Sequence, residues 1–224
     1  MPKVYLSPSD QTKNVYAYGN TNEAEQCGRI AEASRKALER SGVQVMVGHM
    51  ISMQQKCSES NAFGADLHVP IHTNAFNGGV MGTRMFCYDA KGKGMAACKA
   101  IFARVAPLSP GTSENIQVKR YYEVRVPKAP AAYLECEFHD TASGARWIVE
   151  NTTEIGEAIA HGICDYLNVT FVEPAPPQLA QPEQPAGQKL YRVQVGAFAS
   201  RANAEKMLQR LKEAGFDAFI RQDA

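Results

Sequence analysis

Four short polar segments of the chain carry side chains that could perform hydrolytic chemistry. They are residues 7–11, 20–25, 72–75 and 135–140. Each lies at or near the end of an apolar run or the start of a helical pattern, and in open α/β sheets the working residues lie where strands end and loops begin. Imidazole and carboxylate groups are zinc ligands, and zinc catalysis needs about three of them plus a nearby base. The spacings are too long for a local metal-binding motif.

Glu23, His72 and Glu135 also have purely structural interpretations. Glu23 could simply start a helix, where a carboxylate is favoured by the positive end of the helix dipole. His72 could be a hydrogen-bonded histidine at the end of a strand. Glu135 lies in the apolar segment 131–136, where an unpaired charge is costly, so a structural ion pair would also explain it. The residue types alone leave both interpretations open.

Strand and helix patterns alternate over residues 1–172. Apolar residues at helical spacing predict helices at 24–40, 95–105 and 155–167. Short apolar runs predict strands at 3–6, 43–47, 66–72, 82–88 and 132–138. Strands that alternate with helices predict an α/β fold with a mostly parallel central sheet flanked by helices.

A proline-rich segment at 173–188 separates this domain from a tail at 189–224. The segment reads EPAPPQLAQPEQPAGQ and has neither aromatic residues nor periodicity, as in extended linkers. In the tail, alternating apolar residues predict a strand at 191–197, an apolar stripe after Ser200 predicts a helix, and a second strand is expected at 216–221. Such a β-α-β unit is too small to bury a core alone.

Composition and charge exclude several classes of protein. The chain is 45% hydrophobic and 21% charged, which excludes wholesale disorder. No apolar stretch approaches the roughly 18 residues needed to cross a bilayer, so no membrane is expected as a partner. A net charge of +1 removes the strong electrostatic case for nucleic-acid binding. The N-terminus lacks the apolar core of a secretory signal, which predicts cytoplasmic synthesis and later release.

Three of the four polar segments resemble the zinc-dependent N-acetylmuramoyl-L-alanine amidases of the type 3 family, and the resemblance covers essentially all of residues 1–170. In that family a metal-binding Glu opens a helix, a strand ends in Ser-Ile-His-x-Asn, and a late strand carries a catalytic Glu before Gly-Phe. The segments Pro-Ile-His-Thr-Asn-Ala at 70–75 and Leu-Glu-Cys-Glu-Phe at 134–138 match the last two elements. The resemblance implies a Zn²⁺ cofactor, Glu23 and His72 as ligands, Glu135 as base and Asn74 as a substrate contact.

The family pattern begins with a metal-binding His after the first strand. This chain differs from the family at that position. No histidine occurs before residue 49. Aligning Leu-Ser-Pro-Ser-Asp with the family's Leu-Asp-Pro-Gly-His puts Asp10 at the ligand position, and an Asp carboxylate binds zinc well. His139 could instead approach from the side, and Gln11 would be a poorer ligand. We rank the three candidates in the order Asp10, His139, Gln11.

The resemblance implies a peptidoglycan hydrolase of the endolysin or autolysin type, active at the bacterial cell wall after release. It would use zinc-activated water to cleave the amide between N-acetylmuramic acid and L-alanine of the stem peptide. One alternative is a non-catalytic peptidoglycan-binding protein on an amidase scaffold that has lost its first ligand histidine. Another is a cysteine hydrolase that pairs Cys136 or Cys57 with His72 or His139. Cys136, however, would face away from Glu135, and the six cysteines read better as buried free thiols.

The tail resembles one half of a sporulation-related repeat, the SPOR module, which binds peptidoglycan. Residues 191–205 and 214–220 carry the likeness. The full module has two such units, so the missing half must come from elsewhere. A homodimer through paired tails, docking on another surface, or partial disorder would each satisfy this requirement. Gln194 and Phe198 are the expected glycan contacts.

Overall fold

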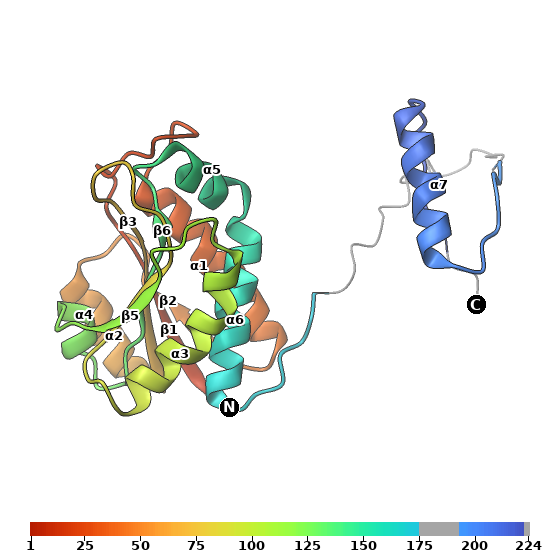
Figure 1. Ribbon diagram of the computed structural model, residues 1–224. Coiled ribbons are helices and arrows are strands. Elements are labelled where there is room, and N and C mark those ends of the chain that lie inside the picture. The colour runs from red at the N-terminus through yellow and green to blue at the C-terminus, as the bar shows by residue number, and fades with distance from the viewer. Residues whose placement is uncertain (175–192, 222–224) are drawn as a thin grey trace. The chain divides into compact units, whose positions relative to one another are not determined.

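The computed structural model describes residues 1–174 and 193–221 of the chain. The chain divides into two compact units, Met1–Glu173 and Pro174–Ala224, and each is described by itself (Figure 1). From residue 175 onward, the expected linker at 173–188 lies outside the described residues. No helix within the described ranges is long and apolar enough to span a bilayer.

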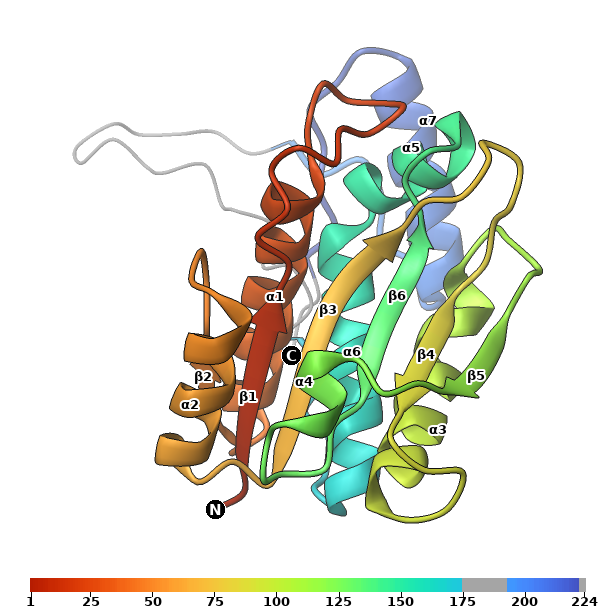
Figure 2. The same ribbon diagram turned by 90° about the vertical axis from the view of Figure 1, so that its left-hand side faces the viewer.

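The first unit is built on one mixed sheet of six strands in the order β2-β1-β3-β6-β4-β5 (Figure 2). In chain order the strands are β1 (Lys3–Pro8), β2 (Gln44–Val47), β3 (Leu67–Asn74), β4 (Arg84–Cys87), β5 (Asn115–Val118) and β6 (Tyr133–Phe138). All neighbouring strands run parallel except β4 and β6, which are antiparallel. The predicted α/β fold with a mostly parallel sheet is confirmed.

Helices cover both faces of this sheet (Figure 2). One face carries α1 (Glu23–Arg40), α3 (Lys93–Val105) and α6 (Thr152–Leu167), and a 3₁₀ turn (Ala106–Leu108) follows α3. The opposite face carries α2 (Met53–Phe63) and the short α4 (Tyr122–Arg125). The remaining helix of this unit, α5 (Ala142–Glu150), directly follows β6.

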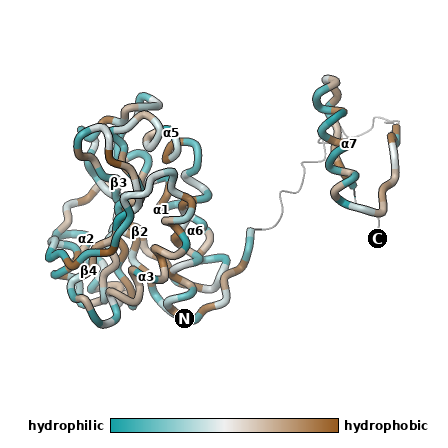
Figure 3. Tube along the Cα trace, viewed as in Figure 1, coloured by the Kyte–Doolittle hydropathy of each residue, from teal (hydrophilic) through white to brown (hydrophobic). Residues whose placement is uncertain are grey.

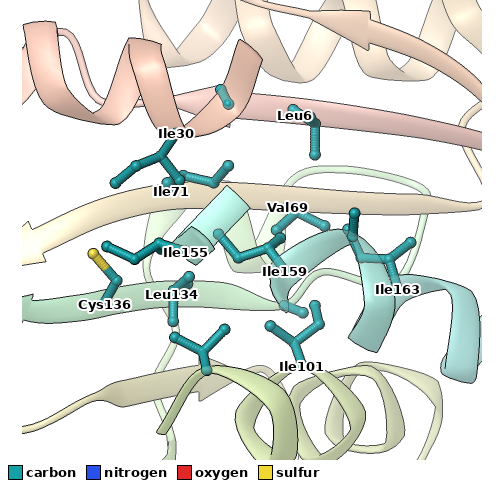
Figure 4. Close-up of a cluster of buried hydrophobic side chains, with 14 of the residues drawn as sticks. Leu6, Ile30, Val69, Ile71, Ile101, Leu134, Cys136, Ile155, Ile159 and Ile163 are labelled. Atoms are coloured by element: carbon teal, nitrogen blue, oxygen red, sulfur yellow. The ribbon is translucent and has the colours of Figure 1, made fainter. Parts of the chain in front are cut away.

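The hydrophobic core lies between the sheet and the α1, α3 and α6 layer (Figure 4). Ile155, Ile159 and Ile163 recur at helical spacing on α6 and are fully buried. Gly156 lets α6 approach α1, because a Cβ there would lie 2.4 Å from the Cβ of Ala33. This close packing fixes α1, whose first turn contributes to the site described below.

A buried contact between His68 and Glu123 holds α4 against the other face of the sheet. His68 Nε2 lies 3.2 Å from Glu123 Oε1, and both side chains are buried. The Ser7 hydroxyl donates to the same oxygen, and the His68 ring stacks on Tyr5. Burial acts to raise the pKa of Glu123, but the bonds from His68 and Ser7 outweigh it, so the pKa is lowered. The carboxylate is therefore the stable form.

Glu123→Ala is expected to lower the free energy of unfolding by about 3–5 kcal/mol, because it leaves the buried His68 and Ser7 without their partner. Urea unfolding at neutral pH measures this change. Glu154→Ala removes an exposed glutamate of α6 and should cost less than about 1 kcal/mol. Equal losses in the two variants would contradict a stabilising role for the buried pair.

The second unit contains α7 (Arg201–Glu213), which confirms the helix predicted after Ser200. The two flanking strands were predicted wrongly, since residues 193–200 and 214–221 contain no strand. A strand needs a neighbour to accept its backbone hydrogen bonds, and two short strands alone are marginal. The helix is largely hydrophilic (Figure 3). Large apolar side chains in the flanking segments are exposed, namely Val193, Val195, Phe198, Phe216 and Phe219.

Candidate active site

The first turn of α1 meets the ends of β3 and β6 at one edge of the sheet. Asn22 caps α1 by accepting a hydrogen bond from the Glu25 backbone N–H at 3.1 Å, which makes Glu23 the first helical residue. On the sheet, β3 and β6 are parallel neighbours, and His72 is in register with Glu135. One helix start and two strands therefore bring Glu23, His72 and Glu135 together.

Glu23 and His72 form a buried pair. Glu23 Oε1 lies 2.8 Å from His72 Nδ1, and Asn14 Nδ2 donates to Glu23 Oε2 at 2.6 Å. Burial acts to raise the pKa of Glu23, but the hydrogen bond to His72 and its neighbours outweigh it, so the pKa is lowered. Burial acts to lower the pKa of His72, yet Glu23 and Glu135 raise it above its usual value. Each partner thus favours the charged form of the other.

Glu135 has a carboxylate oxygen without a partner. The residue is partly exposed, but its Oε2 atom is buried and accepts no hydrogen bond within the described part of the chain. Desolvation raises the pKa of Glu135 to about 7, with Glu23 adding to the shift while His72 and Arg84 oppose it. A free carboxylate oxygen with a pKa near neutrality suits a general base.

The loop after β1 places Gln11, not Asp10, beside this pair. Gln11 Nε2 lies 3.3 Å from His72 Nδ1 and 3.5 Å from Glu23 Oε1. Among residues 1–174 and 193–221, the Asp10 side chain has no hydrogen bond or ion pair, and no three His, Cys, Asp or Glu side chains cluster as metal ligands. The structure thus gives Asp10 no hydrogen bond or ion pair with Glu23 or His72 among the described residues.

His139, the second candidate for the first ligand, has other partners. Its Nδ1 lies 2.9 Å from Thr73 Oγ1, which in turn lies 2.9 Å from the Tyr16 hydroxyl. The His139 ring also stacks on Tyr16. His139 therefore fastens the loop after β1 to the end of β3.

Glu137, at the position where the type 3 pattern often has Gly, is a buried loop anchor. It accepts hydrogen bonds from the backbone N–H groups of Gly82 and Phe138, each at 2.7 Å, and from the Ser109 hydroxyl. Sequence reasoning gave this carboxylate no role, since only the fold brings Gly82 and Ser109 to β6. Asn74 ends β3, partly exposed, and accepts from the Ala75 N–H at 2.9 Å.

The six cysteines are all buried and free, as predicted. Cys136 lies in the core, and burial raises its pKa well above the usual value for a thiol. Burial likewise raises the pKa of Cys57 to about 11. A nucleophilic cysteine needs a thiol whose pKa is lowered. The raised pKa values of Cys136 and Cys57 therefore argue against a cysteine hydrolase.

Comparison with known proteins identifies the family. A family model described as N-acetylmuramoyl-L-alanine amidase matches residues 7–165. The chain belongs to this amidase family. A second model, described as a SPOR domain, matches residues 174–222 of the amidase. The amidase is therefore a peptidoglycan hydrolase of the cell wall, and its family is generally zinc-dependent.

The relatives of the amidase are distant. It is 26% identical over 228 residues to the sporulation-specific N-acetylmuramoyl-L-alanine amidase of Bacillus subtilis, covering 98% of this chain and 84% of that protein. It is 25% identical over 230 residues to the amidase CwlM of Bacillus licheniformis, covering 98% and 85%. The catalytic domain of CwlV from Bacillus (Paenibacillus) polymyxa matches with a TM-score of 0.69 at 17% identity, covering 76% of this chain and all of that one. This last likeness shows the shared fold.

Glu23 and His72 fit a zinc ion chemically. They present a carboxylate oxygen and an imidazole nitrogen 2.8 Å apart, which are two donor types that zinc prefers. The unpartnered Oε2 of Glu135 belongs to the next strand. The pair therefore offers two donor groups of the types that zinc prefers, next to a carboxylate oxygen that has no partner among the described residues.

Proposed function

We propose that this amidase cleaves the amide between the lactyl group of N-acetylmuramic acid and L-alanine of the stem peptide. Glu23 and His72 would hold the zinc ion, and Glu135 would serve as the base. The observation that supports this assignment is the unpartnered Glu135 Oε2 on the strand beside the Glu23–His72 pair. Zinc, when bound, lowers the pKa of a coordinated water and polarises the amide carbonyl.

Side chains of the amidase itself would transfer the proton and hold the metal ligands in place. Glu135 takes up the water proton at Oε2 and returns it to the leaving amine of L-alanine. Before the metal binds, Asn14 and His72 fix the orientation of Glu23 through bonds of 2.6 and 2.8 Å, and the Asn14 bond does not involve the oxygen that faces His72. Tyr133 stacks on the His72 ring with 4.7 Å between centroids and holds the imidazole plane in place. These contacts preorganise the site before substrate arrives.

The rate of the amidase is expected to fall as the pH drops below neutrality. Glu135 must be ionised to accept a proton, and its pKa is raised to about 7. A bound zinc ion adds positive charge and lowers this pKa, so we expect the acidic limb of kcat at a pH of about 5–7. A pH–rate profile on purified sacculi measures the limb. A rate that is constant from pH 8 to pH 4 would contradict the assignment.

We further propose that the SPOR segment binds peptidoglycan and keeps the amidase on its polymer, which raises the effective substrate concentration. Gln194 and Phe198 remain the predicted glycan contacts, and the Phe198 side chain is 42% exposed. Release to the cell wall from cytoplasmic synthesis, and a homodimer through the tails, also remain predictions. Sedimentation at high concentration tests the dimer, which a strictly monomeric profile would rule out.

A chemical test of the proposed bond uses purified sacculi treated with zinc-loaded amidase. The insoluble and soluble fractions are labelled with an amine-reactive reagent, hydrolysed and analysed for labelled amino acids. Labelled L-alanine that accumulates with time is expected, because cleavage exposes its α-amine. Labelling confined to other amino acids would contradict the proposed bond specificity.

A further inference from the structure

The position next to the Glu23–His72 pair is filled by the carboxamide of Gln11. Its amide nitrogen lies 3.3 Å from His72 Nδ1 and 3.5 Å from Glu23 Oε1, while those two atoms are 2.8 Å apart. Three polar atoms on three separate elements thus form a small triangle. They come from the loop after β1, the first turn of α1 and the end of β3.

The two sides of this triangle that end on Gln11, 3.3 and 3.5 Å long, match the donor spacing of a tetrahedral metal, whereas the 2.8 Å side is a hydrogen bond that must open when a metal binds. Zinc bonds of about 2.0–2.2 Å put neighbouring tetrahedral donors roughly 3.3–3.5 Å apart. A carboxamide carries an acceptor oxygen and a donor nitrogen on one planar group. A half-turn about the last side-chain bond of Gln11 therefore brings Oε1 to the corner that Nε2 occupies. That turn gives up the 3.0 Å hydrogen bond from Asn14 Nδ2 to Gln11 Oε1.

Asn14 can release Gln11 without leaving Glu23. Asn14 Nδ2 donates both to Gln11 Oε1 at 3.0 Å and to Glu23 Oε2 at 2.6 Å, and the second bond is independent of the Gln11 orientation. Gln11 itself is exposed, so its carboxamide can turn without disturbing the core. The neighbouring Asp10 makes no hydrogen bond to either member of the pair among the described residues.

We propose that Gln11 Oε1 is the third protein ligand of the metal, in place of the histidine that the family pattern has after the first strand. The proposal rests on the proposed function for Glu23 and His72. The resulting donor set has one imidazole and two oxygens, of which only the Glu23 oxygen is charged. A neutral amide oxygen is a weaker zinc donor than imidazole, so the site binds zinc less tightly than a His–Glu–His site.

Competition titration of the full chain with a chromogenic zinc chelator tests this assignment through affinity alone. Gln11→Ala is expected to weaken zinc binding by about 10–100-fold, and Gln11→His to strengthen it by about tenfold or more. Asp10→Asn is the matched control on the adjacent residue and should leave the affinity within about threefold, since Asp10 makes no hydrogen bond to Glu23 or His72 among the described residues. Gln11 is exposed, so none of these variants is expected to impair folding.

Unchanged zinc affinity in Gln11→Ala would overturn the proposal, as would a large loss confined to Asp10→Asn. Wild-type protein without saturable zinc binding would overturn it as well. The same experiments can refute the proposed reaction independently of the Gln11 assignment. If the affinities follow the predicted ranking but sacculi gain no labelled L-alanine, the Gln11 assignment stands and the proposed reaction does not.

Discussion

Glu135→Gln is expected to reduce kcat on peptidoglycan by about 10²–10⁴-fold, the range that a positioned general base contributes. The glutamine keeps the size and one hydrogen-bonding oxygen of the side chain but cannot accept the proton of the attacking water. KM should change little, because the substitution removes an interaction of the transition state rather than of the bound substrate. Kinetics of solubilisation of labelled sacculi measure both constants.

The same substitution should stabilise the metal-free protein above neutral pH. Glu135 has a folded-state pKa of about 7, raised mainly by desolvation, so its ionisation opposes folding once the pH exceeds the unfolded value. Removing that charge should raise the free energy of unfolding at pH 8 by on the order of 2 kcal/mol, with a smaller gain at pH 4. An inactive variant that is less stable at pH 8 would contradict this account of Glu135.

Glu150→Gln is the matched control, since it makes the same chemical change on a side chain that is 54% exposed at the end of α5. We expect its kcat to equal that of the wild type. A comparable loss of kcat in both variants would show that the effect of Glu135→Gln does not come from a specific base.

His72→Ala is expected to remove both zinc binding and activity. Zinc sites contribute about 10–16 kcal/mol from four ligands, so one ligand supplies roughly 2.5–4 kcal/mol, a loss of about a hundred- to a thousand-fold in affinity. The loss should exceed that of Gln11→Ala, because imidazole is the stronger donor. Zinc competition titration and sacculus kinetics on the same preparation measure the two losses.

His161→Ala is the control for that experiment. His161 lies on α6, stacks on Phe171 and is 3.9 Å from Asp165; among the described residues it makes no hydrogen bond, ion pair or ring contact with Glu23, His72 or Glu135. Unchanged zinc affinity and activity are expected. Glu135→Gln should separate from His72→Ala, since it loses activity but keeps its zinc. Zinc affinity retained in His72→Ala would contradict the ligand assignment.

The predictable part of the fold is the part with strong periodicity. The three long helices on one face and five of the six strands were predicted, because their apolar residues repeat with the period of a helix or of a strand. The helix α2 was missed because it is polar and buries only Lys56, Cys57 and Ser60. Lys56 is buried to donate to the Pro8 carbonyl at 2.7 Å, a contact that no local pattern reveals.

The site was predictable at positions where a charged or imidazole side chain has few structural explanations. Glu135 on an apolar strand and His72 at a strand end were predicted to lie together with Glu23, and the structure brings the three together. The sequence ranked Asp10 ahead of Gln11, whereas the structure places the Gln11 carboxamide beside the Glu23–His72 pair. Adjacent residues of a loop point in different directions, and only the path of the loop, fastened through His139 and Tyr16, determines which side chain faces the pair.

Mass spectrometry of the soluble products from purified sacculi tests the central claim most directly, with wild type and Glu135→Gln compared under zinc. The proposed reaction predicts intact stem peptides with free L-alanine amino termini and glycan chains without peptides, both from the wild type alone. Peptides cut within the stem, or sugars cut at the glycosidic bond, would contradict the account. So would binding to sacculi without any released product.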